Sequence, residues 1–235
     1  MTLPQIKKTL ANYSNKKKAK ILQSFFKTGS GEYAEGDIFI GVTVPQIRKL
    51  AKEYQNISLV VLKKLIKSPI HEERLLALII LVLKFQEATT GKKAEIYRLY
   101  LQNTSYVNNW DLVDLTAANI VGAYLWDKNR SILFKLAKSK NLWERRIAIV
   151  STAYFIKNNQ FKDTLKVAKM LLCDKEDLIH KATGWMLREV GKRDQSLEER
   201  FLSKYQLKMP RITVRYAIER FPEARRQAYL KLKKS

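Results

Sequence analysis

The chain has 235 residues, 46% of them hydrophobic, with eleven Tyr, nine Phe and four Trp, a composition that excludes a disordered protein. Its 45 Lys and Arg against 22 Asp and Glu leave a formal net charge of +23, which favours a polyanionic partner, above all nucleic acid. Eight Gly and five Pro are too few for an architecture of many tight turns. We therefore expect an all-α protein that forms one domain over residues 1–235.

The sequence offers no sign of a membrane protein or of a metalloprotein. The longest apolar run, Leu75–Leu83, has nine residues, well short of the roughly 20 that cross a bilayer. The N-terminus lacks the apolar stretch of a secretory signal, and Cys173 is the only cysteine, so we expect a protein of the cytoplasm or nucleoid without an intrachain disulfide. We also expect a monomer. His71 and His180 are the only histidines, too few for a conventional zinc site. We predict no metal, no cofactor and no membrane partner.

Apolar residues recur at helical spacing along the chain, and strand patterns are almost absent. Thr43, Pro45 and Gln46 form a capping-box pattern, which predicts a helix over residues 45–54. The glycine-rich stretch 28–37 lacks the Gly-Lys-Ser/Thr ending of a phosphate-binding loop and is interpreted as a flexible connector. In chain order, the other expected helices cover residues 4–12, 15–28, 57–67, 70–86, 91–102, 108–125, 129–138, 142–158, 161–172, 175–191, 195–203, 209–220 and 222–232.

Both ends of the sequence are strongly basic. Residues 1–30 contain seven Lys and no acidic residue, and residues 204–235 contain ten Lys or Arg against Glu219 and Glu223. Solvated helix faces and contacts with nucleic-acid phosphates explain these residues equally well.

A repeat of about 35 residues organises the chain. Several helices place one residue, usually basic, just before a small residue in an apolar segment. The equivalent positions are Arg74, Trp110, Arg146, Lys181 and Arg215, at steps of 36, 36, 35 and 34 residues. This period predicts a HEAT-like helical-repeat solenoid whose successive second helices line one concave face. Because four of the five positions are basic, we expect that face to be basic and to wrap a polyanion.

Trp110 and Asp114 are four residues apart, so on a helix they project from the same face, one turn apart. Asn108 or Asn109 is expected to cap that helix, which would make Asp111 a first-turn acid favoured by the helix dipole. Asp114 lies too far along the helix for that explanation. An ordinary salt bridge from Asp114 to Arg146 remains open as a structural alternative.

The predicted helix 175–191 carries Trp185 on a charged face. Lys181, Trp185, Arg188 and Lys192 recur at spacings of 4, 3 and 4, whereas the apolar residues lie on the other side. A tryptophan on such a face offers a flat surface for stacking or for contact with a sugar. Partial burial between repeats is an equally weighted alternative.

Several ordered motifs resemble the AlkD-like DNA alkylation repair family. The motifs cover residues 108–114 (Asn-Asn-Trp-Asp-Leu-Val-Asp), 142–149 (Leu-Trp-Glu-Arg-Arg-Ile-Ala-Ile) and 180–189 (His-Lys-Ala-Thr-Gly-Trp-Met-Leu-Arg-Glu). Segments 39–48 and 209–218 extend the resemblance over nearly the whole chain. The resemblance implies a HEAT-like DNA glycosylase that releases cationic N3- or N7-alkylated purines from duplex DNA without a metal or cofactor.

The resemblance also implies roles for individual residues. It places the catalytic aspartate at Asp114 and its aromatic partners at Trp110 and Trp185. The family's N-terminal aromatic has Phe26 as its nearest match, and Asn109 stands where the family has a second Trp. We expect DNA-binding residues at Arg146, Lys181, Arg188, Arg215 and Arg48.

The proposed chemistry suits these residue types. A fixed carboxylate stabilises the positive charge that develops on the deoxyribose as the glycosidic bond stretches, and it can orient the attacking water. Two other classes of function remain open. A non-catalytic DNA-binding scaffold explains the charge equally well, and fold alone does not license an activity. A HEAT-type protein-interaction adaptor would predict a less one-sided charge.

Overall fold

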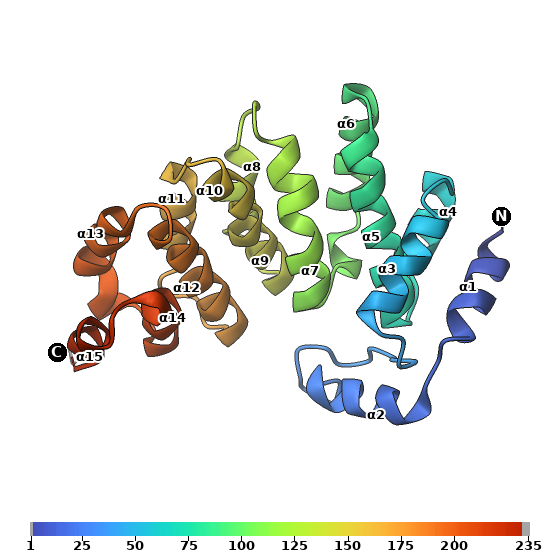
Figure 1. Ribbon diagram of the computed structural model, residues 1–235, viewed down its shortest axis with the longest axis horizontal. Helices are drawn as coiled ribbons and strands as arrows, with labels where there is room; N and C mark the ends of the chain where they lie inside the picture. Colours follow the sequence, from blue (N-terminus) through green and yellow to red (C-terminus); the bar gives the residue numbers. More distant parts are fainter. Residues whose placement is uncertain (1, 232–235) are drawn as a thin grey trace. The chain divides into compact units, whose positions relative to one another are not determined.

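The computed structural model describes residues 2–231 and is built from helices (Figure 1). Within that range, the only β-type pairing is an isolated bridge between Ile38 and Ile70, so the prediction of an all-α protein is confirmed. None of the described helices is long and apolar enough to span a membrane. The chain divides into two compact units, Met1–Thr116 and Ala117–Ser235, and the expectation of a single domain remains a prediction.

In the first unit, the long helix α5 packs against α3, α4 and α6. Helix α3 begins at the predicted capping box, where the Thr43 backbone N–H and hydroxyl both donate to Oε1 of Gln46, at 2.9 and 2.7 Å. The helices of this unit are α1 (Leu3–Ala11), α2 (Lys16–Phe25), α3 (Val44–Glu53), α4 (Leu59–Ile66), α5 (His71–Glu87), α6 (Thr90–Leu101), the 3-10 turn η1 (Thr104–Tyr106) and most of α7 (Trp110–Ala117).

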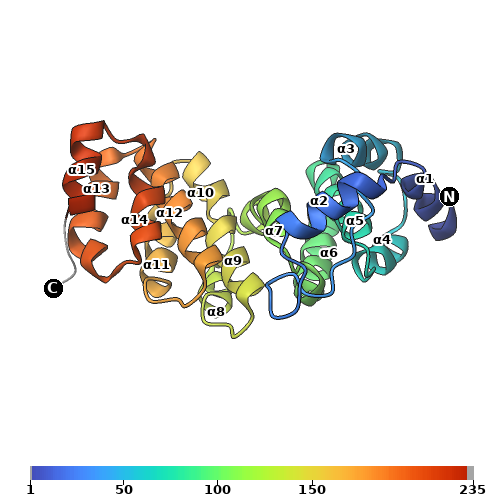
Figure 2. The same cartoon turned by 90° about the horizontal axis from the view of Figure 1, so that it is seen from below.

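Helix α2 lies across the N-terminal ends of α3 and α5 (Figures 1 and 2). The Asn15 N–H, just before α2, donates to the Ile40 carbonyl at 2.8 Å. Gly41 allows this close approach, because its φ is +84° and a Cβ there would collide with the Asn15 carbonyl. Ala19 is the only buried residue of α2 itself, so this helix is attached through little apolar surface.

The second unit is centred on α12, which packs against α9, α13 and α14. Gly184 allows α12 and α14 to approach closely, because a Cβ at this position would meet the Thr213 carbonyl oxygen. The helices of this unit are the π-helical turn η2 (Ala118–Gly122), α8 (Ser131–Leu136), α9 (Leu142–Ser151), α10 (Ala153–Lys157), α11 (Lys162–Met170), α12 (Asp177–Gly191), α13 (Gln195–Tyr205), η3 (Gln206–Lys208), α14 (Arg211–Ala217), η4 (Ile218–Arg220) and α15 (Glu223–Lys231).

The predicted helices agree closely with the observed ones, with two informative differences. The segment 108–125, expected as one helix, is α7 followed by the π-helical turn η2. The segment 142–158 is interrupted at Thr152, whose hydroxyl donates to the Ile149 carbonyl at 2.6 Å. Such a bond competes with the regular helical ladder, and periodicity of apolar residues does not reveal it.

Candidate functional site

The first turn of α7 holds Trp110 and Asp111 through side chains that cap the helix. Asn109 is fully buried, and its Oδ1 accepts a hydrogen bond from the Trp110 N–H at 2.8 Å. Oδ1 of Asp111 accepts one from the Leu112 N–H, also at 2.8 Å. Trp110 and Asp114 are partly exposed, whereas Leu112 and Val113 between them are fully buried. Trp110 and Asp114 therefore both keep some accessible surface on α7.

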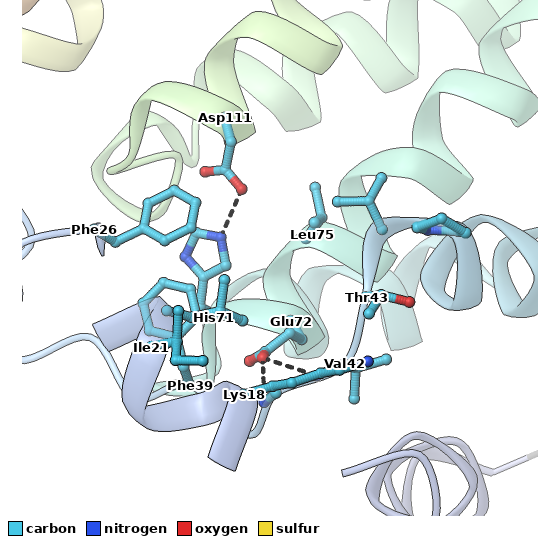
Figure 3. A pocket seen from close by; sticks show the side chains of 14 residues that line it. Lys18, Ile21, Phe26, Phe39, Val42, Thr43, His71, Glu72, Leu75 and Asp111 are labelled. Atoms are coloured by element: carbon cyan, nitrogen blue, oxygen red, sulfur yellow. Dashed lines mark hydrogen bonds and ion pairs between the residues drawn. The ribbon is translucent and has the colours of Figure 1, made fainter. Parts of the chain in front are cut away.

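A buried network of charged groups lies beneath this turn. His71, the first residue of α5, contacts two carboxylates: its Nε2 lies 2.9 Å from Oδ2 of Asp111 (Figure 3), and its Nδ1 lies 3.2 Å from Oδ2 of Asp37. Arg74 donates from Nη2 to Oδ1 of Asp37 at 2.6 Å and from Nη1 to the Ser68 carbonyl at 2.9 Å. The network ties the glycine-rich loop, α5 and α7 together.

The network shifts the protonation of its members. Burial alone would lower the pKa of His71, but the Asp111 carboxylate and the hydrogen bonds to Asp111 and Asp37 raise it above its usual value. Burial alone would raise the pKa of Asp37, but the hydrogen bond with His71 and the Arg74 charge lower it. Both pKa shifts favour a protonated His71 ring, which lies between the carboxylates of Asp37 and Asp111.

Four rings form a continuous stack from α7 to the network. Trp110 lies over Phe26 with centroids 5.0 Å apart, Phe26 over Phe39 at 4.9 Å, and Phe39 over His71 at 4.3 Å. The Trp110 indole N–H donates to the Tyr33 hydroxyl at 3.2 Å. These contacts fix the plane of the Trp110 ring.

Phe26, the nearest match to the family's N-terminal aromatic, is inside this stack and only 6% exposed. Its neighbour Phe25 is 62% exposed and meets Trp110 edge to face, with centroids 6.0 Å apart. Phe25 is therefore the accessible aromatic of this pair next to Trp110.

In the second unit, α12 carries its polar and apolar residues on opposite sides, as its spacing predicted. The apolar side is buried, and Lys181, Trp185 and Arg188 are partly exposed. Lys181 pairs with Asp177 at 2.6 Å, and Arg188 pairs with Glu219 of the 3-10 turn η4.

The basic positions of the repeat differ in exposure. Arg74 was expected on the basic face, and this expectation is wrong, because Arg74 is 2% exposed and held by Asp37. Arg146 is 5% exposed, and its Nη1 donates to the Leu178 carbonyl at 2.5 Å. Arg215 and the predicted Arg48 of α3 are both exposed.

Sequence reasoning missed Asp37 and the role of His71. Asp37 ends the stretch that was interpreted as a connector, and His71 was considered only as a metal ligand. Asp37, His71 and Asp111 are separated by 34 and 40 residues, a spacing with no local pattern. The available signal was the capped first turn of α7, which already placed Asp111 at a helix start.

Comparisons with known proteins agree with this fold. The sequence matches the model of the family described as "DNA alkylation repair enzyme" over residues 6–221, and the chain belongs to that family. No curated protein sequence matches it.

Three similar solved structures are a predicted DNA alkylation repair enzyme from Enterococcus faecalis, AlkD2 from Streptococcus mutans and smu.31 from Streptococcus mutans UA159. The first is 17% identical, with a TM-score of 0.68 over 89% of this chain and 97% of that one. AlkD2 and smu.31 are each 19% identical with a TM-score of 0.55, over 88% and 94% of this chain and 99% of each of theirs. At these identities the likeness concerns the fold.

Proposed function

We propose that this protein is a DNA glycosylase that hydrolyses the N-glycosidic bond of cationic N3- or N7-alkylated purines in duplex DNA. The observation that carries the proposal is the pair formed by Trp110 and Asp114, one turn apart on α7, in a chain of the DNA alkylation repair enzyme family. A net charge of +23 suits a duplex as the partner.

In this reaction the C1′–N bond breaks, and the alkylated purine leaves as a neutral base. A water oxygen bonds to C1′, and the water releases one proton. Because the leaving group is already cationic, the barrier lies in the positive charge that develops on the sugar. The Asp114 carboxylate would stabilise that charge and orient the water. Trp110, one turn from Asp114 on α7, would offer an electron-rich face to the same cation, and the role of Trp185 on α12 stays a prediction.

The buried network has a positioning role in this proposal. Asp111 is held by His71 and caps its own helix turn, and Trp110 is held by Phe26 and Tyr33. Rigid support of this kind keeps reacting groups within the narrow geometry that catalysis requires. Asp114 would therefore meet the sugar without reorganisation of its helix.

The predicted DNA-binding residues differ in how much of each side chain is exposed. Only an exposed side chain has room to contact a phosphate. Arg48 and Arg215 are exposed, and Lys181 is partly exposed, so we propose these three as phosphate contacts. Lys181 pairs with Asp177 but keeps 37% of its side chain exposed, whereas the Arg188 side chain is 17% exposed and Arg146 is buried. We propose that Arg146 and Arg188 position neighbouring elements and contribute less to affinity.

The decisive test is Asp114→Asn, which removes the charge and keeps the shape. Release of N7-methylguanine or N3-methyladenine from duplex DNA under single-turnover conditions should slow by roughly 10² or more, about 2.7 kcal/mol of transition-state stabilisation. The matched control is Asp127→Asn, which removes the same charge at an exposed carboxylate and should leave the rate unchanged.

Stability and DNA affinity of each variant must be measured alongside, because a structural Asp114 would lose stability when changed. Equal rates for the wild type and Asp114→Asn would exclude Asp114 as the catalytic group. If neither protein releases a base while both bind DNA tightly, the chain is a non-catalytic DNA-binding scaffold.

A further inference from the structure

A cavity of about 350 Å³ lies in the first unit between α2 and the N-terminal ends of α3 and α5. Its interior is formed by buried residues, and its rim by more exposed ones from α2 and the start of α3. Figure 3 shows Phe26, Phe39 and His71 on one side of the cavity and Leu75 and Thr43 opposite them. The volume is in the range of small-molecule sites.

The polar side chains of the interior already have protein partners. Oε1 of Glu72 accepts from the N–H groups of Ile40, Gly41 and Val42, at 3.1, 2.8 and 3.3 Å. His71 and Asp111 bond to each other at 2.9 Å. Lys18 lies at the exposed rim, and in the interior a charged ligand would lose its hydration without gaining a partner for its charge, which is costly.

The interior also favours a flat ring over a flexible chain. Phe26 and Phe39 line it, and both are held in the ring stack described above. Rigid aromatic walls bind another aromatic ring by edge-to-face or offset contacts in addition to the burial of its surface. The polar groups of the interior already have hydrogen-bond partners, and the walls are aromatic. We therefore propose that the cavity binds an uncharged, hydrocarbon-like aromatic molecule of one or two rings.

The entrance to the cavity lies along helix α2. Ile21 is 62% exposed at the rim, and α2 buries only Ala19 of its own residues. The cavity is open at this rim. A ligand therefore enters past Ile21, while Phe26 and Phe39 stay stacked on each other. The cavity shares Phe26, His71 and Asp111 with the positioning network, but binding of a ligand there can be tested without Asp114 and without DNA.

The test uses indole as the probe and the methyl signals of Leu22, Val42 and Leu75 in NMR spectra of the whole chain as the readout. Indole should shift these signals in a saturable manner. Val44→Trp places a large ring at the rim and should weaken indole binding at least about tenfold by steric exclusion. The matched control Val60→Trp makes the same change at an exposed site on α4 outside the cavity and should leave binding unchanged.

Each other outcome contradicts the proposal. It fails if indole shifts none of these methyl signals, or if Val44→Trp binds indole as well as the wild type does. Equal binding of tryptamine, which adds an ammonium group, would overturn the requirement for an uncharged ligand. Tighter binding of N3-methyladenine than of indole would overturn the hydrocarbon-like character. If Val44→Trp does not fold, Ile21→Trp replaces it, with the same expected loss.

Discussion

The two units differ in how their charged side chains are buried and paired. In the first unit, Asp37, His71 and Arg74 are all buried and bonded to one another. In the second, the Arg130–Asp163 pair is partly exposed, and the one buried acid of α13, Glu198, has no hydrogen-bond partner for Oε1 among the described residues. Paired burial fixes geometry, because each group is held from two sides. A buried carboxyl that lacks a partner for one oxygen has a raised pKa, so the stability that it contributes falls as pH rises.

The variant with the largest expected effect removes the carboxylate that the buried network of the first unit shares. Asp37→Ala leaves Arg74 and His71 buried without their shared carboxylate, and removal of one partner from a buried pair costs about 3 to 5 kcal/mol. Urea unfolding should detect the loss, and amide hydrogen exchange should localise it to the first unit. The matched variant in the second unit is Asp163→Ala, whose partner Arg130 keeps bonds to the Leu125 and Trp126 carbonyls.

Asp163→Ala should cost only about 1 kcal/mol or less, because the Arg130–Asp163 pair lies nearer to water. Equal losses for the two variants would show that the depth of burial does not distinguish the two units.

Local signals in the sequence predicted the helices and much of α7, whereas the network depends on tertiary contacts. Thr43 and Gln46 predicted the start of α3, because a capping box is a local sequence pattern. Arg74 looked like a surface cation because periodicity cannot show that Asp37, which is distant in sequence, reaches it. Spacing alone placed Trp110 and Asp114 on the same face of one helix, whereas their catalytic role is implied by the family resemblance and stays a prediction.

The second expected effect comes from Glu198, the buried acid whose Oε1 lacks a hydrogen-bond partner. Burial raises the pKa of Glu198 to about 8, the Glu199 carboxylate adds to the rise, and the Arg188 charge opposes it. The folded state therefore keeps a proton that the unfolded chain loses near pH 4.5. The stability from this group is full below pH 4.5 and declines as pH rises towards 8, by roughly 1 to 4 kcal/mol.

Glu198→Gln cannot ionise, so its urea-unfolding free energy should lack this decline between pH 5 and 8. Glu53→Gln removes an exposed carboxyl in the first unit and should retain the decline of the wild type. Parallel pH profiles for the wild type and Glu198→Gln would mean that Glu198 is ionised in the folded protein and that the contrast between the units is smaller than their burial indicates.

The smallest effect tests whether both units contact a duplex. Arg48 lies on α3 of the first unit and Arg215 on α14 of the second, and both are exposed. If each binds a phosphate, Arg48→Ala and Arg215→Ala should each lower the magnitude of the slope of log K against log salt by about one. Neither variant should change the preference among base sequences, because phosphate contacts carry no sequence information.

Lys63→Ala on α4 is the control, since it removes an exposed charge that we do not assign to DNA, and its slope should equal that of the wild type. Equilibrium binding to one duplex over a series of salt concentrations gives all four slopes. A lower slope for Arg215→Ala alone would confine phosphate binding to the second unit. An unchanged slope for both arginine variants would exclude them as phosphate contacts, and a wild-type slope near zero would mean that the charge of +23 does not drive DNA binding.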